Sequence, residues 1–263
     1  MANVSQAVTL LTDFGLSDGY VAQMKGAILG IAPDARIVDV THEVPPQDVL
    51  RAAWLISDAY PSFPEGTVHA VVVDPGVGSE RRVICVSAAG QLFLAPDNGV
   101  LELVLRRAAN PVIFEVSEAR YFRAEVSRTF HGRDIFAPVA AHLANGLDPA
   151  KLGPTLSGPV RLDIPVATFA GGRINGSVAF ADRFGNLITD IDAGLLGELS
   201  GEPVVRVAGR EIRGISRTYS DAPPGGLVCY VGSSDRLEIA VTGGSAVKEL
   251  GSSTGEPVEV ATR

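Results

Sequence analysis

Apolar positions recur with two different periods over the first 153 residues. Short apolar runs bounded by turn residues are typical of strands, and apolar residues at every third or fourth position are typical of amphipathic helices. The pattern predicts strands over 8–15, 35–40, 68–73, 83–87, 91–95 and 111–116, and helices over 20–31, 49–60, 100–107 and 139–144. This alternation predicts an α/β domain with a mostly parallel sheet covered by helices. Ser17-Asp18-Gly19 is expected to supply the N-cap of the first helix.

The pattern changes after Gly153. From about residue 164 the helical period almost vanishes, and turns rich in Gly, Ser, Asp and Pro separate short β-rich runs over 172–181, 187–191, 203–207, 210–215, 227–231, 236–240 and 257–261. Such a series is typical of a small antiparallel barrel or sandwich. We therefore predict an N-terminal α/β domain (1–153), a linker (154–168) and a smaller all-β C-terminal barrel domain (169–263).

Composition narrows the classes of function. Of 263 residues, 46% are hydrophobic and 20% charged, as in a compact soluble protein with a sizeable core. A net charge of -8, with no Lys/Arg cluster longer than a pair, argues against a nucleic-acid partner. Residues 1–6 carry no targeting pattern and no apolar run approaches the roughly 20 residues that a bilayer requires, so we expect no membrane partner and a cytoplasmic location. Cys85 and Cys229 lie in apolar, strand-like contexts and are interpreted as buried free thiols.

The most informative stretch surrounds Asp74. The β-branched run Val71-Val72-Val73 predicts a buried parallel strand, and Pro75, Gly76 and Gly78 end it in a sharp turn. Asp74 therefore sits at the carboxyl end of a strand, where open α/β sheets bind ligands. Arg81 lies near enough downstream to fold back toward it. A carboxylate and a guanidinium at a strand end favour a chemical role.

Other polar residues occupy comparable positions. Asp13 and Asn98 also follow strands, and His131 lies at a helix start, where main-chain N–H groups favour a neutral imidazole or a bound anion. In the second domain, the turns 181–186 and 231–234 combine aromatic, amide and hydroxyl side chains.

Each of these residues has a structural alternative. Asp is favoured in caps and turns on local grounds, so Asp13 and Asp74 could serve there instead. A histidine at a helix start can serve only as a local hydrogen-bonding group, and Arg133-Asp134 could be a simple ion pair. His42, His69 and His142 show no partner in the sequence and are interpreted as structural or surface residues.

Other chemistries find less support. Two aspartates and a histidine could bind a divalent ion, but no His-x-His, His-Glu-x-x-His or Asp-x-Asp spacing occurs. A serine hydrolase and a dinucleotide fold are disfavoured, because neither Gly-x-Ser-x-Gly nor Gly-x-Gly-x-x-Gly is present in its expected context.

Taken together, these residues carry a resemblance that spans nearly the whole chain. The sequence resembles the S-adenosyl-L-methionine (SAM) hydroxide adenosyltransferases, the SAM hydrolase sister family of the fluorinase and chlorinase. The resemblance rests on six motifs in order: Thr12-Asp13-Phe14-Gly15, Asp74-Pro75-Gly76-Val77-Gly78 with Arg81, Ala95-Pro96-Asp97-Asn98-Gly99, Thr129-Phe130-His131-Gly132-Arg133-Asp134, Phe184-Gly185-Asn186, and Leu237-Glu238-Ile239-Ala240. It implies an N-terminal α/β domain, a C-terminal barrel, and a homotrimer whose sites lie between the N-domain of one subunit and the C-domain of a neighbour.

The resemblance also implies roles for individual residues. A water-activating triad falls on Asp74, Arg81 and His131, with Arg82 as the alternative arginine. Asp13 would bind the ribose hydroxyls, Phe184 would lie against the adenine, and Asn186 would bind its edge. Asp18, Asp182 and Ser233 match the groups that hold the methionine part. The residues expected to bind substrate are thus Asp13, Asp18, Asn98, Asp182, Phe184, Asn186 and Ser233.

One departure distinguishes the branches of the family. The halogenases place a tyrosine and a serine where Asp74 and Gly132 stand here, and a carboxylate would repel a halide in a low-dielectric site. The resemblance therefore favours hydrolysis of SAM to adenosine and L-methionine, by a water attacking the ribose C5', with no metal or organic cofactor. A halogenase and a non-catalytic SAM or adenosine sensor remain the alternatives.

Overall fold

The computed structural model describes residues 7–262, which form two compact units. One unit ends at Asp163 and the other begins at Ile164, so the division falls within the predicted linker. The exact domain limits stay a prediction. Residues 1–6, on which the expectation of no targeting segment rests, lie outside the described residues.

The first unit is built on a six-stranded sheet in the order β2-β1-β3-β5-β4-β6. Neighbours among β1 (Ala7–Thr12), β2 (Arg36–Thr41), β3 (Val68–Val72) and β5 (Gln91–Pro96) pair in parallel. Only β4 (Val83–Ala88) runs against its neighbours, β5 and β6 (Val112–Glu115). The prediction of a mostly parallel sheet is confirmed.

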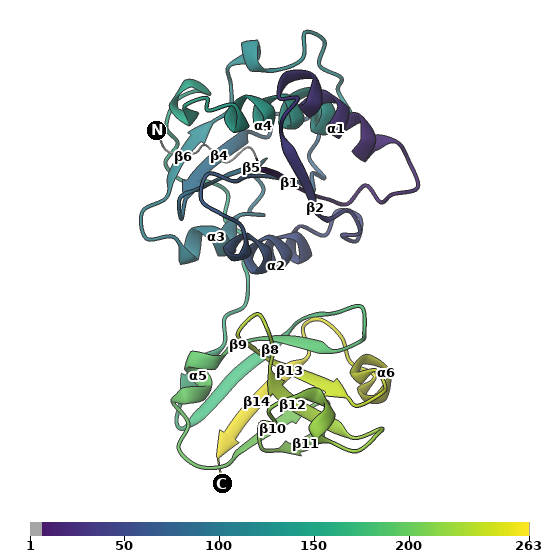
Figure 1. Ribbon diagram of the computed structural model, residues 1–263. Helices are drawn as coiled ribbons and strands as arrows, with labels where there is room; N and C mark the ends of the chain where they lie inside the picture. The colour runs from purple at the N-terminus through teal and green to yellow at the C-terminus, as the bar shows by residue number, and fades with distance from the viewer. Residues whose placement is uncertain (1–6, 263) are drawn as a thin grey trace. The chain divides into compact units, whose positions relative to one another are not determined.

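Helices cover both faces of this sheet (Figure 1). α1 (Tyr20–Ile31) and α4 (Ala137–Ala144) lie on one face, and α2 (Val49–Ala59) and α3 (Glu102–Arg107) on the other. Ala70 and Val72 of β3 pack toward the first pair, whereas Val71 packs toward the second. Because β3 is buried on both faces, its sequence reads as an unbroken apolar run.

The caps of the first two helices differ from each other. Asp48 caps α2 by accepting the N–H of Arg51 at 2.8 Å, whereas α1 has Gly19 at its N-cap and no side-chain cap. The prediction that Ser17-Asp18-Gly19 supplies the N-cap of α1 is confirmed, because the cap is Gly19, whose main-chain oxygen accepts the N–H of Gln23 at 3.0 Å.

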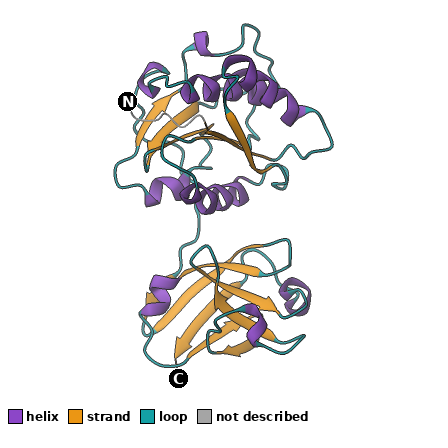
Figure 2. Cartoon of the chain, in the orientation of Figure 1, coloured by secondary structure: helices purple, strands orange, loops and turns teal. Residues whose placement is uncertain are grey.

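The second unit is an eight-stranded antiparallel sheet in the order β11-β10-β14-β8-β9-β13-β12, with β7 paired to β8. Strands make up most of this unit (Figure 2). A bridge between Ser216 and Tyr230, beyond β11 and within β12, brings its two edges together in a nearly closed barrel. The predicted barrel is confirmed. Its elements are β7 (Thr168–Ala170), β8 (Arg173–Ala181), β9 (Leu187–Asp192), α5 (Ala193–Gly197), β10 (Pro203–Val207), β11 (Arg210–Arg213), β12 (Leu227–Val231), β13 (Arg236–Val241), α6 (Ala246–Leu250) and β14 (Pro257–Thr262).

Three of these elements, β7, α5 and α6, were not predicted from the sequence. They are three to five residues long, too short for a hydrophobic period to be recognised.

Both cysteines lie inside the two cores. Cys85 and Cys229 are free thiols with no exposed surface, and burial raises the pKa of each to about 12. A thiol that stays protonated is unreactive, so their interpretation as core residues is confirmed. Within residues 7–262, no helix is both long and apolar enough to cross a membrane.

Candidate active site

Asp74 begins the turn that follows β3, at the carboxyl end of the parallel strands. Gly78 in this turn has a φ of +79°, and a Cβ built on it would lie 2.3 Å from the main-chain oxygen of Arg128. Only glycine allows both that backbone conformation and that close approach. The Asp74 turn is thereby packed against the segment that leads to His131.

Arg81 joins Asp74 to His131. Its Nε donates to both Asp74 carboxylate oxygens, at 3.0 and 2.9 Å, and its NH2 group donates to Asp74 and, at 2.7 Å, to His131 Nδ1. The side chains of Asp74 and Arg81 are only 6% and 12% exposed, so water screens this ion pair weakly. The structure thus brings the three predicted residues together, with Arg81 in the middle.

The protonation of His131 follows from these contacts. Since a guanidinium can only donate, Nδ1 must be the unprotonated nitrogen, and a neutral ring carries its proton on Nε2. Burial and then the charge of Arg81 lower the pKa of His131 from 6.5. The charges of Asp74 and Asp134 and a hydrogen bond with the Ser127 main chain oppose this shift without reversing it. We therefore expect a neutral imidazole at pH 7.

A buried carboxylate holds the segment that carries His131. Asp134 has no exposed surface; it accepts hydrogen bonds from Arg133 Nε and NH2 at 2.7 and 3.0 Å and from the Ser127 N–H at 2.9 Å. The segment Gly132–Phe136 is a π-helical turn that leads directly into α4, and such turns are frequent at functional sites. The ion-pair interpretation of Arg133-Asp134 is confirmed, and the pair braces the turn after His131.

Asp74 and His131 line a cavity of about 370 Å³, which Asp13 also lines. One oxygen of Asp13 accepts the N–H of Gln47 at 2.8 Å. The aromatic rings of Phe14, Tyr20 and Phe130 also line the cavity. They pack against one another with centroid distances of 5.2 to 5.9 Å. The cavity therefore combines an apolar wall with two carboxylates, an imidazole and, behind them, a guanidinium.

Several lining residues were missed by the sequence reasoning. Phe14 and Phe130 lie inside quoted motifs and could have been found there. Gln47 comes from a loop with no motif, so only the structure identifies it.

Two residues that were predicted to bind substrate, Asp18 and Asn98, are not among the described residues that line this cavity. Asp18 is exposed in the loop before α1. Asn98 donates to the main-chain oxygen of Val73 at 2.9 Å and accepts the N–H of Val100 at 3.1 Å. Asn98 thus holds the chain immediately before Asp74, and its predicted contact with substrate remains untested.

The residues next to Asn98 anchor the segment 158–162. Asp97 accepts the N–H of Val160 at 2.8 Å and pairs with Arg82, whose Nε lies 2.8 Å from its carboxylate. Glu102, only 1% exposed, accepts two hydrogen bonds from Arg161, at 2.5 and 2.7 Å. Arg82 therefore serves this anchor, and of the two candidate arginines it is Arg81 that contacts Asp74 and His131.

The second unit has a cavity of its own, of about 560 Å³. All four residues predicted in this unit line it, namely Asp182, Phe184, Asn186 and Ser233. Tyr219 and Glu238 also belong to its lining. Asp182 accepts the N–H groups of Phe184 and Asn186 at 2.9 and 2.8 Å and the Asn186 side-chain amide at 2.9 Å, which fixes the turn. Phe184 is 78% exposed.

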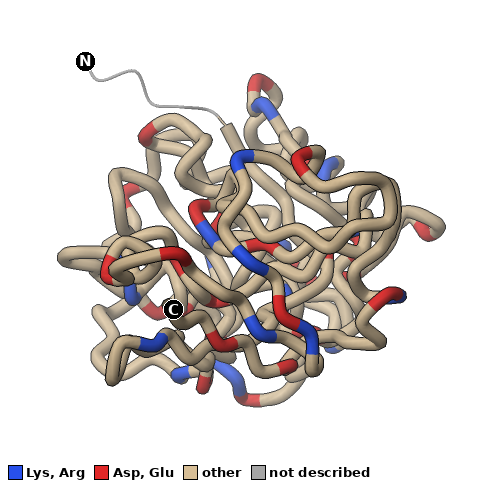
Figure 3. Tube along the Cα trace, turned by 90° about the horizontal axis from the view of Figure 1, so that it is seen from below, with Lys and Arg blue, Asp and Glu red and all other residues tan. Residues whose placement is uncertain are grey.

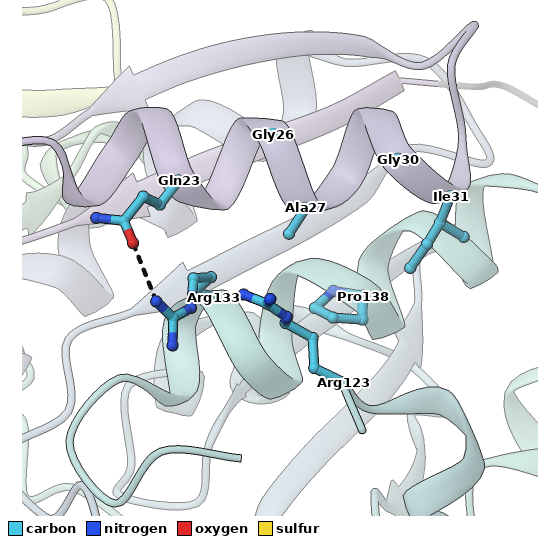
Figure 4. Close-up of a pocket in the computed structure, with 8 residues that line it drawn as sticks. All are labelled: Gln23, Gly26, Ala27, Gly30, Ile31, Arg123, Arg133 and Pro138. Carbon is cyan, nitrogen blue, oxygen red and sulfur yellow. Dashed lines mark hydrogen bonds between the residues drawn. The ribbon is translucent and has the colours of Figure 1, made fainter. Parts of the chain in front are cut away.

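A further cavity of about 460 Å³ lies beside α1 and contains no predicted site residue (Figure 4). Gln23 and Arg133 meet across it in a hydrogen bond of 3.0 Å.

Basic and acidic residues are interspersed along the described chain (Figure 3). Among residues 7–262, no group of three or more His, Cys, Asp or Glu side chains could hold a metal ion.

Comparisons with known proteins find relatives that match nearly the whole chain. The chain is 42% identical over 261 residues to a Thermus thermophilus protein named (R)-S-adenosyl-L-methionine hydrolase, covering 96% of this chain and 98% of that one. A Salinispora arenicola protein of the same name is 40% identical over 256 residues, covering 96% and 97%. A fluorinase from an Actinoplanes species is 34% identical over 217 residues, covering 72% and 73%.

The fold and the family follow from two further matches. The crystal structure of an uncharacterized conserved protein from Thermotoga maritima superimposes with a TM-score of 0.90 at 37% identity, covering 97% of this chain and 99% of that one. The sequence models of the SAM hydroxide adenosyltransferase N-terminal and C-terminal domains match residues 8–153 and 176–259. The chain therefore belongs to the SAM hydroxide adenosyltransferase family.

Proposed function

We propose that this protein hydrolyses SAM to adenosine and L-methionine. The full-length relatives that carry the name (R)-S-adenosyl-L-methionine hydrolase support this function. The observation that carries it is the contact of Arg81 with both Asp74 and His131 at a cavity that Asp13 also lines. We propose these three residues as the catalytic group and Asp13 as the ribose-binding carboxylate.

The reaction needs a nucleophile more than it needs an acid. The water oxygen forms a bond to the ribose C5', the C5'–sulfur bond breaks, and its electron pair neutralises the sulfonium as methionine leaves. The sulfur departs without a proton, so no general acid is required. Water has a pKa of about 15.7, and the site must therefore remove a proton or stabilise hydroxide character.

The hydrogen bonds favour Asp74 over His131 as the proton acceptor. Arg81 occupies the Nδ1 lone pair of His131, so a neutral ring has no free lone pair in this arrangement. A carboxylate has about four lone-pair sites, and Asp74 keeps acceptor capacity beyond its contacts with Arg81. We propose that Asp74 takes the proton, that Arg81 stabilises the developing charge, and that His131 orients Arg81.

A halogenase is the second candidate. The Actinoplanes fluorinase is a relative, but two features of this chain argue against the same chemistry here. The Nε and NH2 groups of Arg81 are committed to Asp74 and His131, and a carboxylate faces any bound halide. A Cβ at Gly132 would lie 3.2 Å from each of three side chains, so a serine at this position would be crowded.

Three further proposals come from the family resemblance. We propose a homotrimer with active sites at subunit interfaces, a cytoplasmic location, and catalysis without a metal or organic cofactor. We also propose that Asp18, Asn98, Asp182, Phe184, Asn186 and Ser233 bind substrate. Light scattering on the purified protein tests the trimer, and dialysis against a chelator followed by assay tests the independence from metal.

The reaction is tested by incubating the purified protein with SAM in heavy-oxygen water and separating the products by chromatography. We expect equal amounts of adenosine and methionine, with the label in the adenosine 5'-hydroxyl. Separate incubations with the two sulfonium epimers report the stereochemical preference. A 5'-halo-5'-deoxyadenosine formed with chloride or fluoride would establish the halogenase instead, and tight SAM binding without any product would establish a sensor.

A further inference from the structure

A chain of polar contacts leads from Thr12, the residue before Asp13, to the protein surface. Thr12 Oγ1 lies 2.8 Å from Nδ1 of His42, and His42 Nε2 lies 3.1 Å from an oxygen of Asp39. The other Asp39 oxygen accepts a hydrogen bond from Lys25 of α1 at 2.6 Å. Thr12 has no exposed surface and His42 only 3%, whereas the side chains of Asp39 and Lys25 are 37% and 34% exposed, so the chain leads from the interior to the surface.

The proton positions in the chain follow from Asp39. A carboxylate can only accept, so the Nε2 of His42 that faces it at 3.1 Å carries the ring proton. Nδ1 of a neutral ring then accepts the hydroxyl proton of Thr12, whose oxygen also accepts the N–H of Phe14 at 3.2 Å. The two residues that flank Asp13 in the sequence, Thr12 and Phe14, are thus joined to each other and to His42.

The loop that starts at His42 contacts the Asp13 turn at two more points. The carbonyl of His42 accepts the N–H of Gly15 at 2.8 Å, and the N–H of Gln47 donates to Asp13 itself at 2.8 Å. Gln47 has a φ of +65°, a conformation that non-glycine residues seldom adopt and that structures retain mainly at functional sites. The Asp13 turn is therefore held by the His42 side chain through Thr12, by the His42 carbonyl and by the Gln47 N–H.

An irregularity in β2 directly precedes His42. Leu10 pairs with Asp39 but Leu11 pairs with Thr41, so β2 contains one extra residue at this point. Such bulges re-aim the side chains that follow them and are over-represented next to active sites.

We propose that His42 is a positioning residue for substrate binding, acting through Thr12 to hold the Asp13 carboxylate toward the ribose hydroxyls. This inference rests on the proposed function. It assigns a role to a histidine that the sequence indicated to be structural or on the surface. Because Asp13 would hold the ribose equally before and during the reaction, loss of the Thr12–His42 hydrogen bond should weaken substrate binding and leave the rate of the chemical step unchanged.

Strand β1 supplies a matched control. Thr9, only 1% exposed, makes the same kind of hydrogen bond to another buried histidine, since its Oγ1 lies 2.7 Å from Nδ1 of His69. Replacing either threonine by valine keeps the shape of the side chain and removes one buried threonine–histidine hydrogen bond, and at Thr12 it also removes the acceptor of the Phe14 N–H. Only the Thr12–His42 bond lies beside Asp13.

The experiment compares Thr12→Val, Thr12→Ser and Thr9→Val in the full chain. We expect Thr12→Val to raise the KM for SAM and the Kd for adenosine about tenfold with kcat within about twofold, and Thr12→Ser to restore wild-type values. Thr9→Val should lose similar stability without changing KM. In an Asp13→Ala background, Thr12→Val should have no further effect on the adenosine Kd, because the two residues act as one unit.

Amide hydrogen exchange supplies a readout that needs no substrate. Thr12→Val should speed exchange at Phe14, Gly15 and Gln47, and Thr9→Val should not. An unchanged KM together with unchanged exchange would overturn the inference, as would equal effects of the two valine variants. If the wild-type protein hydrolyses no SAM, the proposed function fails, and the exchange data still decide whether His42 and Thr12 hold the Asp13 turn.

Discussion

Replacing Asp74 by asparagine should remove most of the turnover and leave adenosine binding nearly intact. Asparagine keeps the size of the side chain but cannot accept a proton from water at neutral pH. A positioned general base contributes roughly 10²- to 10⁴-fold to a rate, which corresponds to about 3 to 5 kcal/mol of activation free energy. We therefore expect kcat to fall by about 10²- to 10⁴-fold, with an adenosine Kd within about threefold of wild type, because the ribose and adenine contacts are untouched.

The same substitution has a calculable effect on stability. Arg81 Nε donates to both Asp74 oxygens, at 3.0 and 2.9 Å, and an amide offers only one acceptor oxygen. At least one charge-assisted hydrogen bond is lost, and such bonds contribute about 1.5 to 3 kcal/mol. The Arg81 contact with His131 remains, so the variant should fold, with a free energy of unfolding lowered by about that amount in urea titrations.

Asp97→Asn is the matched control. Asp97 pairs with the neighbouring Arg82 at 2.8 Å, its side chain is 1% exposed, and it does not line the cavity as the described residues form it. This variant should lose comparable stability and keep kcat within about threefold of wild type. The reasoning is refuted if Asp74→Asn retains more than about a tenth of wild-type kcat, or if Asp97→Asn loses as much activity.

Three other predictions follow from buried contacts. Gly78→Ala should lower the free energy of unfolding by about 3 kcal/mol and disrupt activity, because the new methyl group would clash with Arg128. Gly209→Ala places a methyl group in open space at a similar φ of +71° and should lower it by only about 1 kcal/mol. Equal losses in urea titrations would contradict the clash. Burial lowers the pKa of His69 from 6.5 to about 4, so the free energy of unfolding should be insensitive to this group above pH 6.5 and fall by about 1.4 kcal/mol per pH unit from pH 6.5 down to about pH 4. His69→Gln should remove that slope, and an unchanged slope would show that another titrating group causes it. Glu102→Gln should speed tryptic cleavage after Arg161 about tenfold, because it weakens the anchor of that segment, and gel electrophoresis showing wild-type rates would exclude this role.

Local pattern was sufficient for most of the fold and for much of the site. The apolar run at Val71-Val73 and the glycines after it predicted a buried strand with Asp74 at its end, and the parallel sheet confirms that position. Asp13 and Asp74 were both predicted to follow strands, and they line one cavity because the carboxyl ends of parallel strands share one edge. Periodicity failed where an element was only three to five residues long, as in β7, α5 and α6, because so few positions do not establish a period.

The amino-acid sequence by itself determined the elements, their order and the chemical groups available at the strand ends, because hydrophobic period and turn residues act over a few neighbours. Only the tertiary structure decided which groups meet. Arg81 and Arg82 are adjacent and chemically identical, yet the first contacts Asp74 and His131 and the second contacts Asp97. Likewise, 30 residues separate Thr12 from His42, and no local pattern joins them. Successive side chains of an extended segment point in opposite directions, and their partners come from distant strands, so these pairings depend on how the whole sheet is assembled.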